Sequence, residues 1–239
     1  MTDIVRPQGH LGGKTPESQF FAIATLLAGI PTEGVVDVEA IASWPGIMLD
    51  VAVKHAASYW NGGSGRHFLV AGYHDSDVAE ERFALPRLHN NYGLARTTGL
   101  HTQVHARHAG EQAEWLADKV VELGIESLAL SIPSFHMARG YLTTIESLRR
   151  RGVMIPIIPI PPKVSPFEHC VLNVAPEGKR DKCELDVIHA EANPRMKNYQ
   201  NPKADGTPGD VATDEFFYDY LGWLYGQQIV TDYTMKGMP

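Results

Sequence analysis

The chain has 239 residues, of which 44% are hydrophobic and 21% charged, a composition typical of a globular protein with a substantial core. The formal net charge of -7, with no Lys/Arg run longer than residues 149–151, argues against a nucleic-acid-binding protein. Two cysteines, Cys170 and Cys183, are too few for a disulfide framework, and no apolar run approaches the ~18 residues of a membrane span.

The amino-terminal part of the chain predicts a helix, a strand, a second helix and a second strand. Thr15 and Pro16 are a typical helix start, because a capping hydroxyl is followed by proline at the first helical position. The valine-rich run at residues 34–42 predicts a strand, and residues 47–60 predict the next helix. Residues 67–72 are short, apolar and end in glycine, which predicts a second, buried strand.

The rest of the chain continues the alternation after a segment without a clear pattern. Charges and histidines interrupt every apolar period in residues 73–107, so no element is predicted there. Beyond it, the predicted elements are helices at residues 110–123, 137–151 and 216–228 and strands at residues 127–132 and 153–160. The prolines of the last strand predict that it lies near an edge of the sheet or is irregular.

Strands and helices that alternate at these intervals indicate a single α/β domain. We predict a Rossmann-like three-layer sandwich with a mostly parallel sheet and right-handed crossovers. Residues 1–33 form an amino-terminal extension and helix, and residues 34–239 form the α/β domain. The strands expected to be neighbours in the sheet are residues 35–41, 67–71, 127–132 and 153–158.

The loops at the carboxyl ends of these strands are the predicted ligand site, because open parallel sheets bind ligands there. Residues 43–46, 72–75 and 133–136 are the loops in question. The ligand-binding residues predicted from these loops and the adjoining helix starts are Trp44, Gly72, Tyr73, His74, His108, Ser134 and Arg139.

His136, Arg139 and Glu111 are the predicted catalytic residues. His136 follows a buried strand at a helix start, where free backbone N–H groups favour an anion, and it exchanges protons near neutral pH. Arg139 offers a guanidinium fork for phosphate or carboxylate, and Glu111 would orient His136 or a ligand hydroxyl. We expect all three to converge on one pocket. The alternative is structural: His136 satisfies a loop carbonyl, Arg139 forms a surface ion pair, and Glu111 only complements the helix dipole.

Arg139 also yields a specific expectation. Replacing it by alanine should weaken an anionic ligand by roughly 1.5–3 kcal/mol, with much less effect on fold stability.

Three histidines form a second candidate site. His101, His105 and His108 stand at i, i+4 and i+7, which is one face if the segment is helical. Neutral imidazoles at that spacing bind zinc, so a metal-dependent hydrolase is an alternative function. The segment has no His-Glu-x-x-His pattern and no nearby acidic ligand, so a solvated, polar loop with several histidines is the preferred interpretation. We therefore expect no tightly held metal.

The order of these segments resembles the YdcF/SanA-like family, a domain of unknown function. Residues 34–42 and 68–72 are similar to its first two strands, and residues 108–113 to its glutamate motif. Residues 131–139, with His136 and Arg139, resemble its His/Arg motif, and residues 191–195 with Tyr199 its late segment. The chain departs from the family at three places. Trp44-Pro45 and Tyr73 replace glycines, and His108-Ala109 replaces an Asn-Thr pair.

The resemblance implies a Rossmann-like fold and makes S-adenosylmethionine a candidate ligand. No GxGxxG or GxxxxGK[ST] loop follows the first strand, so we expect no standard nucleotide-binding loop. The leading hypothesis is a cytoplasmic small-molecule enzyme whose substrate or cofactor carries a nucleotide-like or phosphate-like anion. A non-catalytic protein that binds such a ligand is the first alternative. Because residues 1–14 lack the features of a signal peptide, we expect a cytoplasmic protein without membrane or nucleic-acid partners, with a homodimer left open.

Overall fold

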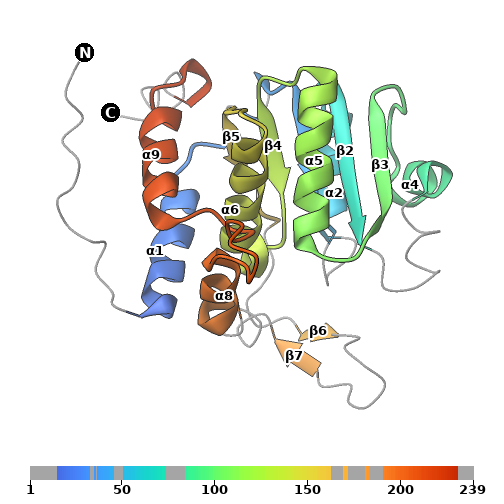
Figure 1. Ribbon diagram of the computed structural model, residues 1–239. Coiled ribbons are helices and arrows are strands. Elements are labelled where there is room, and N and C mark those ends of the chain that lie inside the picture. The colour runs from blue at the N-terminus through green and yellow to red at the C-terminus, as the bar shows by residue number, and fades with distance from the viewer. Residues whose placement is uncertain are drawn as a thin grey trace, which may run out of the picture.

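The chain is described from a computed structural model. The residues that the structure describes are 15–32, 35, 37–45, 51–73, 84–162, 169–171, 181–183 and 191–230. The fold is a central parallel sheet with helices on both faces (Figure 1).

The central sheet has five strands, all parallel, in the order β3-β2-β1-β4-β5. Its strands are β1 (Ala40–Ser43), β2 (His67–Tyr73), β3 (Leu100–Ala106), β4 (Leu128–Ser131) and β5 (Ile157–Pro159). The first three strands progress toward one edge, and the chain then crosses back over β1 to build the other half. This order is that of a doubly wound α/β fold, so the predicted fold class is confirmed.

Helices cover the two faces of the sheet in two groups. On one face lie α2 (Val51–Asn61) and α4 (Leu85–Tyr92). On the other face lie α5 (Ala109–Leu123) and α6 (Ser134–Arg150), together with α1 (Pro16–Ala28) and α9 (Asp214–Leu224). A π-helical turn, η2 (Glu191–Arg195), leads into the short helix α8 (Met196–Gln200). Apart from this sheet, β6 (His169–Val171) and β7 (Asp181–Cys183) form an antiparallel pair.

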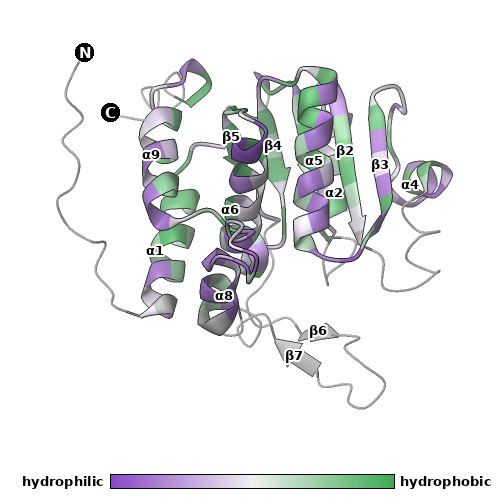
Figure 2. Cartoon of the chain, in the orientation of Figure 1, coloured by the Kyte–Doolittle hydropathy of each residue, from purple (hydrophilic) through white to green (hydrophobic). Residues whose placement is uncertain are grey.

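Alternating side chains of the strands fill two separate cores. Ala40 and Ala42 of β1 face the core under α5 and α6, whereas Ile41 faces the core under α2. On β2, Leu69 faces the core under α5 and α6, and Phe68 faces the core under α2. This period of two explains why the strands are apolar throughout: both faces are covered by helices. Figure 2 shows hydrophobic residues on the central strands and hydrophilic residues on the outward side of α5.

Two strand boundaries differ from the sequence prediction. Residues 35–41 were expected as the first strand, but β1 begins at Ala40, and the preceding Val35 and Val38 are buried in the α2-side core. Their apolar character reflects burial rather than strand pairing. The last strand begins at Ile157 instead of residue 153, because Pro156 has no N–H to donate to a ladder. Its predicted position at an edge of the sheet is confirmed.

The first helix belongs to the larger core. Thr15 caps α1 as predicted, accepting a hydrogen bond from the Ser18 N–H. Phe20, Ile23 and Leu27 on α1 are buried in the same cluster as α5, α6 and α9. None of the helices in the described part of the chain combines the length and apolar character needed to cross a lipid bilayer.

Candidate functional site

The carboxyl ends of β1 and β4 lie side by side, where the strand order reverses. Ser43 pairs with Ser131 in the register of the two strands, and the Trp44 N–H donates to the Ser131 carbonyl at 3.0 Å. From this point one connection runs toward α2 and the other enters α6. The crevice between such diverging connections is where doubly wound sheets place their ligands.

Three buried polar atoms at this edge have no hydrogen-bond partner among the described residues. They are the Ser43 hydroxyl oxygen, Trp44 Nε1 and His136 Nε2. Ser43 and Trp44 are 0% and 1% exposed, so bulk solvent does not reach these two side chains. An unpaired buried polar group costs about 1–3 kcal/mol. Ser43 is in register with Ser131, whose hydroxyl bonds the Ala52 carbonyl of α2, whereas Trp44 is buried in the core under α6. The unpaired atoms therefore follow two adjacent strands but lie toward opposite faces of the sheet. A bound ligand is one explanation for unpaired groups of this kind.

His136 lies in the first turn of α6, where its N–H bonds the Pro133 carbonyl at 2.9 Å. Burial of the ring lowers its pKa to about 3, with a further contribution from the charge of Arg139 and an opposing one from Glu191. The imidazole is therefore neutral at neutral pH. In this state Nε2 serves as a hydrogen-bonding group toward a ligand, and its basicity is weak.

Arg139 lies one turn further along α6 and pairs with Glu191 of η2. Its Nε and Nη2 donate to the two carboxylate oxygens, Nη2 at 3.2 Å, and both residues are buried. Arg195 Nη1 donates to the same carboxylate at 2.9 Å. Burial raises the pKa of Glu191, but the His136 ring and the hydrogen bonds from Arg139 and Arg195 lower it to about 2. The result is two guanidinium groups around one carboxylate, which leaves one excess positive charge beside His136.

The predicted convergence of three catalytic residues is only partly found. His136 and Arg139 lie together, and Glu191 and Arg195 join them. Glu111 instead lies at the start of α5, where it accepts hydrogen bonds from the Arg107 N–H at 2.7 Å and from Arg107 Nε at 2.9 Å. The hydrogen bonds from Arg107 lower the pKa of Glu111 to about 2. The described partner of the Glu111 carboxylate is therefore Arg107, in the loop that precedes α5.

The other predicted ligand-binding residues lie at three strand ends. Ser134 begins α6 and is exposed, beside a helix start that no side chain caps. Gly72 is buried near the end of β2, and Tyr73 ends that strand. His108 is the N-cap of α5 and accepts from the Glu111 N–H at 3.3 Å. His74 lies outside the described residues.

The histidine cluster does not form, because its segment is a strand. His101 and His105 belong to β3, where four residues span ~13 Å, whereas a helix would stack them one turn apart. His101 instead approaches His67 on β2, with 3.3 Å between His67 Nδ1 and His101 Nε2. Within the described ranges, no group of three or more His, Cys, Asp or Glu side chains is placed to hold a metal ion.

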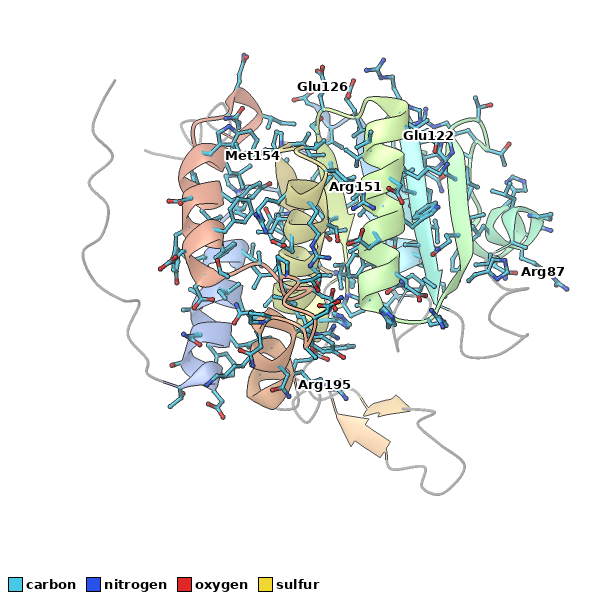
Figure 3. All side chains as sticks on the ribbon, in the orientation of Figure 1. Arg87, Glu122, Glu126, Arg151, Met154 and Arg195 are labelled. Atoms are coloured by element: carbon cyan, nitrogen blue, oxygen red, sulfur yellow. The ribbon has the colours of Figure 1, made fainter. Side chains whose placement is uncertain are left out.

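An open hollow lies at the opposite edge of the sheet. It has a volume of about 480 Å³ and is lined by Asp37, Glu39, Glu126, Ser127, Pro156, Gln227, Gln228 and Ile229. These residues precede β1, β4 and β5 or follow α9. Figure 3 shows Glu126 and Arg195 at opposite ends of the molecule, so this acidic hollow is separate from the carboxyl-edge site.

Comparison with known proteins finds no family model that matches the chain and no matching curated protein. The resemblance to the YdcF/SanA-like family therefore depends only on the motif residues quoted above.

Ser43, Glu191 and Arg195 were not predicted as site residues. Ser43 carried a weak signal, since a serine ends an otherwise apolar strand directly before Trp44. Glu191 and Arg195 are 52 and 56 residues beyond Arg139 in the chain, and no local pattern connects them.

Proposed function

We propose that the chain is a small-molecule enzyme that binds an anionic, phosphate-bearing or nucleotide-like ligand at the carboxyl ends of β1 and β4. The observation that carries the proposal is the set of buried atoms on Ser43, Trp44 and His136 for which the described residues offer no hydrogen-bond partner. Trp44 Nε1 can only donate, so the ligand must present an acceptor to it. The Ser43 hydroxyl and His136 Nε2 accommodate either hydrogen-bonding role.

The charge of the neighbouring network supports an anion. Arg139 and Arg195 share the single carboxylate of Glu191, and the Arg195 side chain is 50% exposed. Arg195 is therefore the guanidinium better placed to reach a ligand. Arg139 is better described as the residue that fixes η2 to α6, since both its fork and its partner are buried. Arg139→Ala should accordingly lose substantial stability, because it would leave Glu191 with one partner.

S-adenosylmethionine remains a candidate ligand through the resemblance to the YdcF/SanA-like family. Its carboxylate and ribose hydroxyls are acceptors of the kind that Trp44 Nε1 requires. Inorganic phosphate and AMP represent the alternative in which phosphate is the recognised group.

A non-catalytic binding protein is the second candidate function. The low pKa of His136, caused mainly by burial, makes its imidazole a weak base at neutral pH. That property suits ligand recognition without proton transfer. Assays for turnover of phosphoesters and nucleotides, beside the binding measurements below, separate the two functions.

Two serine variants at the paired strand ends test the site. Ser43→Ala removes an unpaired buried hydroxyl, so it should leave stability unchanged or raise it while weakening the ligand. Ser131→Ala is the matched control, because its hydroxyl donates to the Ala52 carbonyl at 2.9 Å. That variant should lose about 1 kcal/mol of stability. Denaturant unfolding of both variants measures whether each substitution raises or lowers the free energy of unfolding.

Calorimetric titration measures the effect of the substitutions on ligand affinity. Phosphate, AMP and S-adenosylmethionine are each titrated into wild type, Ser43→Ala and Trp44→Phe. We expect at least one probe to bind wild type and to bind both variants several-fold more weakly. Destabilisation by Ser43→Ala equal to that by Ser131→Ala, or affinities unaffected by either substitution, would overturn the assignment. Mass spectrometry of small molecules that co-purify with the protein identifies the natural ligand.

A further inference from the structure

His67 and His101 form a hydrogen-bonded pair of side chains that joins β2 to the edge strand β3. His67 is the first residue of β2, and His101 is the second residue of β3. Nδ1 of His67 lies 3.3 Å from Nε2 of His101, and the ring centroids are 5.4 Å apart. The contact runs diagonally across the ladder, because the residue opposite His101 is Leu69. It therefore adds a side-chain link to the backbone pairing of the two strands.

The charged groups around the pair balance one another. Arg66, directly before β2, acts on the ring of His67, and Lys119 and Glu122 of α5 act on the other ring. Arg66 is paired with Glu39, and Lys119 is paired with Glu122 at 2.6 Å. These four groups together carry no net charge, so they do not offset positive charge that protonation adds to the two rings.

The hydrogen bond of the pair requires that at least one of the two facing nitrogens lacks a proton. A neutral imidazole has one donor and one acceptor nitrogen, whereas an imidazolium has two donors. A single added proton preserves the bond, because the imidazolium donates to the neutral ring. A second proton turns two N–H groups toward each other across 3.3 Å and places two positive charges on rings 5.4 Å apart. The bond is then lost and the rings repel each other.

The paired state disfavours protonation of both rings. Burial lowers the pKa of His67, with a further contribution from the charge of Arg66. Burial also lowers the pKa of His101, assisted by His67 and Lys119 and opposed by Glu122. A ring released from the pair titrates near its ordinary value of 6.5. Released β3 therefore binds more protons than paired β3 below that pH, so the pairing is weakened as the pH falls.

We propose that the His67–His101 pair is an acid-sensitive contact that holds β3 on β2 and releases this edge strand when both rings are protonated. Within the described residues, β2 is the one strand that pairs with β3. Local opening of an edge strand costs less free energy than global unfolding, so a change at one contact can shift its equilibrium. The pair is separate from the atoms of β1, β4 and α6 on which the function proposed above depends.

Hydrogen exchange of the full chain between about pH 5 and 7.5, corrected for the intrinsic exchange rate at each pH, tests the proposal. Protection of residues 100–106 should fall by up to about tenfold per pH unit below 6.5 for each proton taken up on opening. Protection of residues 128–131 in β4 should fall less, because β4 lies inside the sheet and opens only with the rest of the fold. The difference between the two strands separates release of β3 from a general loss of stability.

His101→Gln should remove this difference in pH dependence, because the glutamine side chain does not titrate. His67→Gln should give the same result, and thermal melts near pH 7.5 verify that each variant is folded. His89→Gln is the matched control, because His89 is exposed on α4, and this variant should behave as wild type.

Nuclear magnetic resonance titration of the imidazoles supplies a direct readout of the contact. In wild type, His67 and His101 should titrate in two coupled steps, whereas His67 in His101→Gln should titrate in one. Independent titration of the two rings in wild type would refute the contact. Protection of β3 that follows β4 at every pH, or an unchanged difference in both folded glutamine variants, would refute the release of the strand.

Discussion

His136 has an environment that keeps its imidazole neutral at neutral pH. Burial lowers its pKa to about 3, and Arg139 and Arg195 oppose its protonation further, whereas Glu191 favours it. In the unfolded chain the group titrates near its ordinary value of 6.5. Between these two pH values the unfolded chain holds a proton that the folded protein does not. Stability therefore falls as the pH is lowered from 6.5 toward 3.

His136→Gln should remove this dependence. Above about pH 5.5, Glu191 is ionised in both states, because its ordinary pKa is 4.5 and its pKa in the folded protein is about 2. In that range the slope of unfolding free energy against pH should decrease. The decrease should be up to about 1.4 kcal/mol per pH unit. Urea unfolding between about pH 5.5 and 7 measures it, and His89→Gln controls for the loss of an imidazole. An unchanged slope would mean that His136 is protonated in the folded protein.

At the scale of single elements, the turn into β3 depends on Gly99. Its φ of 83° is left-handed, and its carbonyl accepts the first ladder bond, from the Phe68 N–H at 2.8 Å. A Cβ at this position would overlap the backbone carbonyl oxygen of Arg66. Glycine is required here by both its conformation and the close approach of β2.

Gly99→Ala should therefore destabilise the fold by more than the roughly 1–2 kcal/mol expected of a left-handed alanine alone. Gly124→Ala is the comparison, because Gly124 also has a positive φ of 63° but has open space around it. Guanidinium unfolding of the two variants separates overlap with β2 from conformational strain. Equal losses would show that β2 and β3 adjust without cost.

At the scale of the whole molecule, α9 closes the β5 edge of the sheet. The Tyr220 hydroxyl donates to the Ile155 carbonyl at 2.8 Å and accepts from the Ile157 N–H at 3.0 Å. These bonds satisfy backbone groups that an edge strand would otherwise leave unpaired. A helix near the carboxyl end of the described chain thus supports a strand more than sixty residues earlier.

Tyr220→Phe should lose about 1–3 kcal/mol of stability, since two buried backbone groups would be left without partners. Tyr225→Phe should lose less, because the Tyr225 hydroxyl donates one hydrogen bond within the described residues, to the Gly29 carbonyl at 3.2 Å, in an exposed position. Thermal and chemical unfolding of both variants gives the comparison. A loss no greater for Tyr220→Phe would imply that other groups satisfy the β5 edge.

The sequence by itself determined the elements whose signals are local. Thr15 and Pro16 predicted the start of α1. Apolar runs predicted β2 and β4, because a strand covered by helices on both faces is apolar throughout. The alternation of these helices and strands was enough to predict the doubly wound α/β fold class. β3 was missed because it is an edge strand whose polar residues break the apolar period.

The tertiary structure alone decided the partners of the candidate residues. Arg139 has the chemistry of an anion ligand in sequence, but its fork is occupied by Glu191, 52 residues away. His101 was expected beside His105 and contacts His67 on the neighbouring strand instead. Such contacts depend on the order and register of the strands, which bring together residues that no local period relates. Local propensity is therefore sufficient for the fold class, whereas the charge state and pairing of each site residue are set by long-range packing.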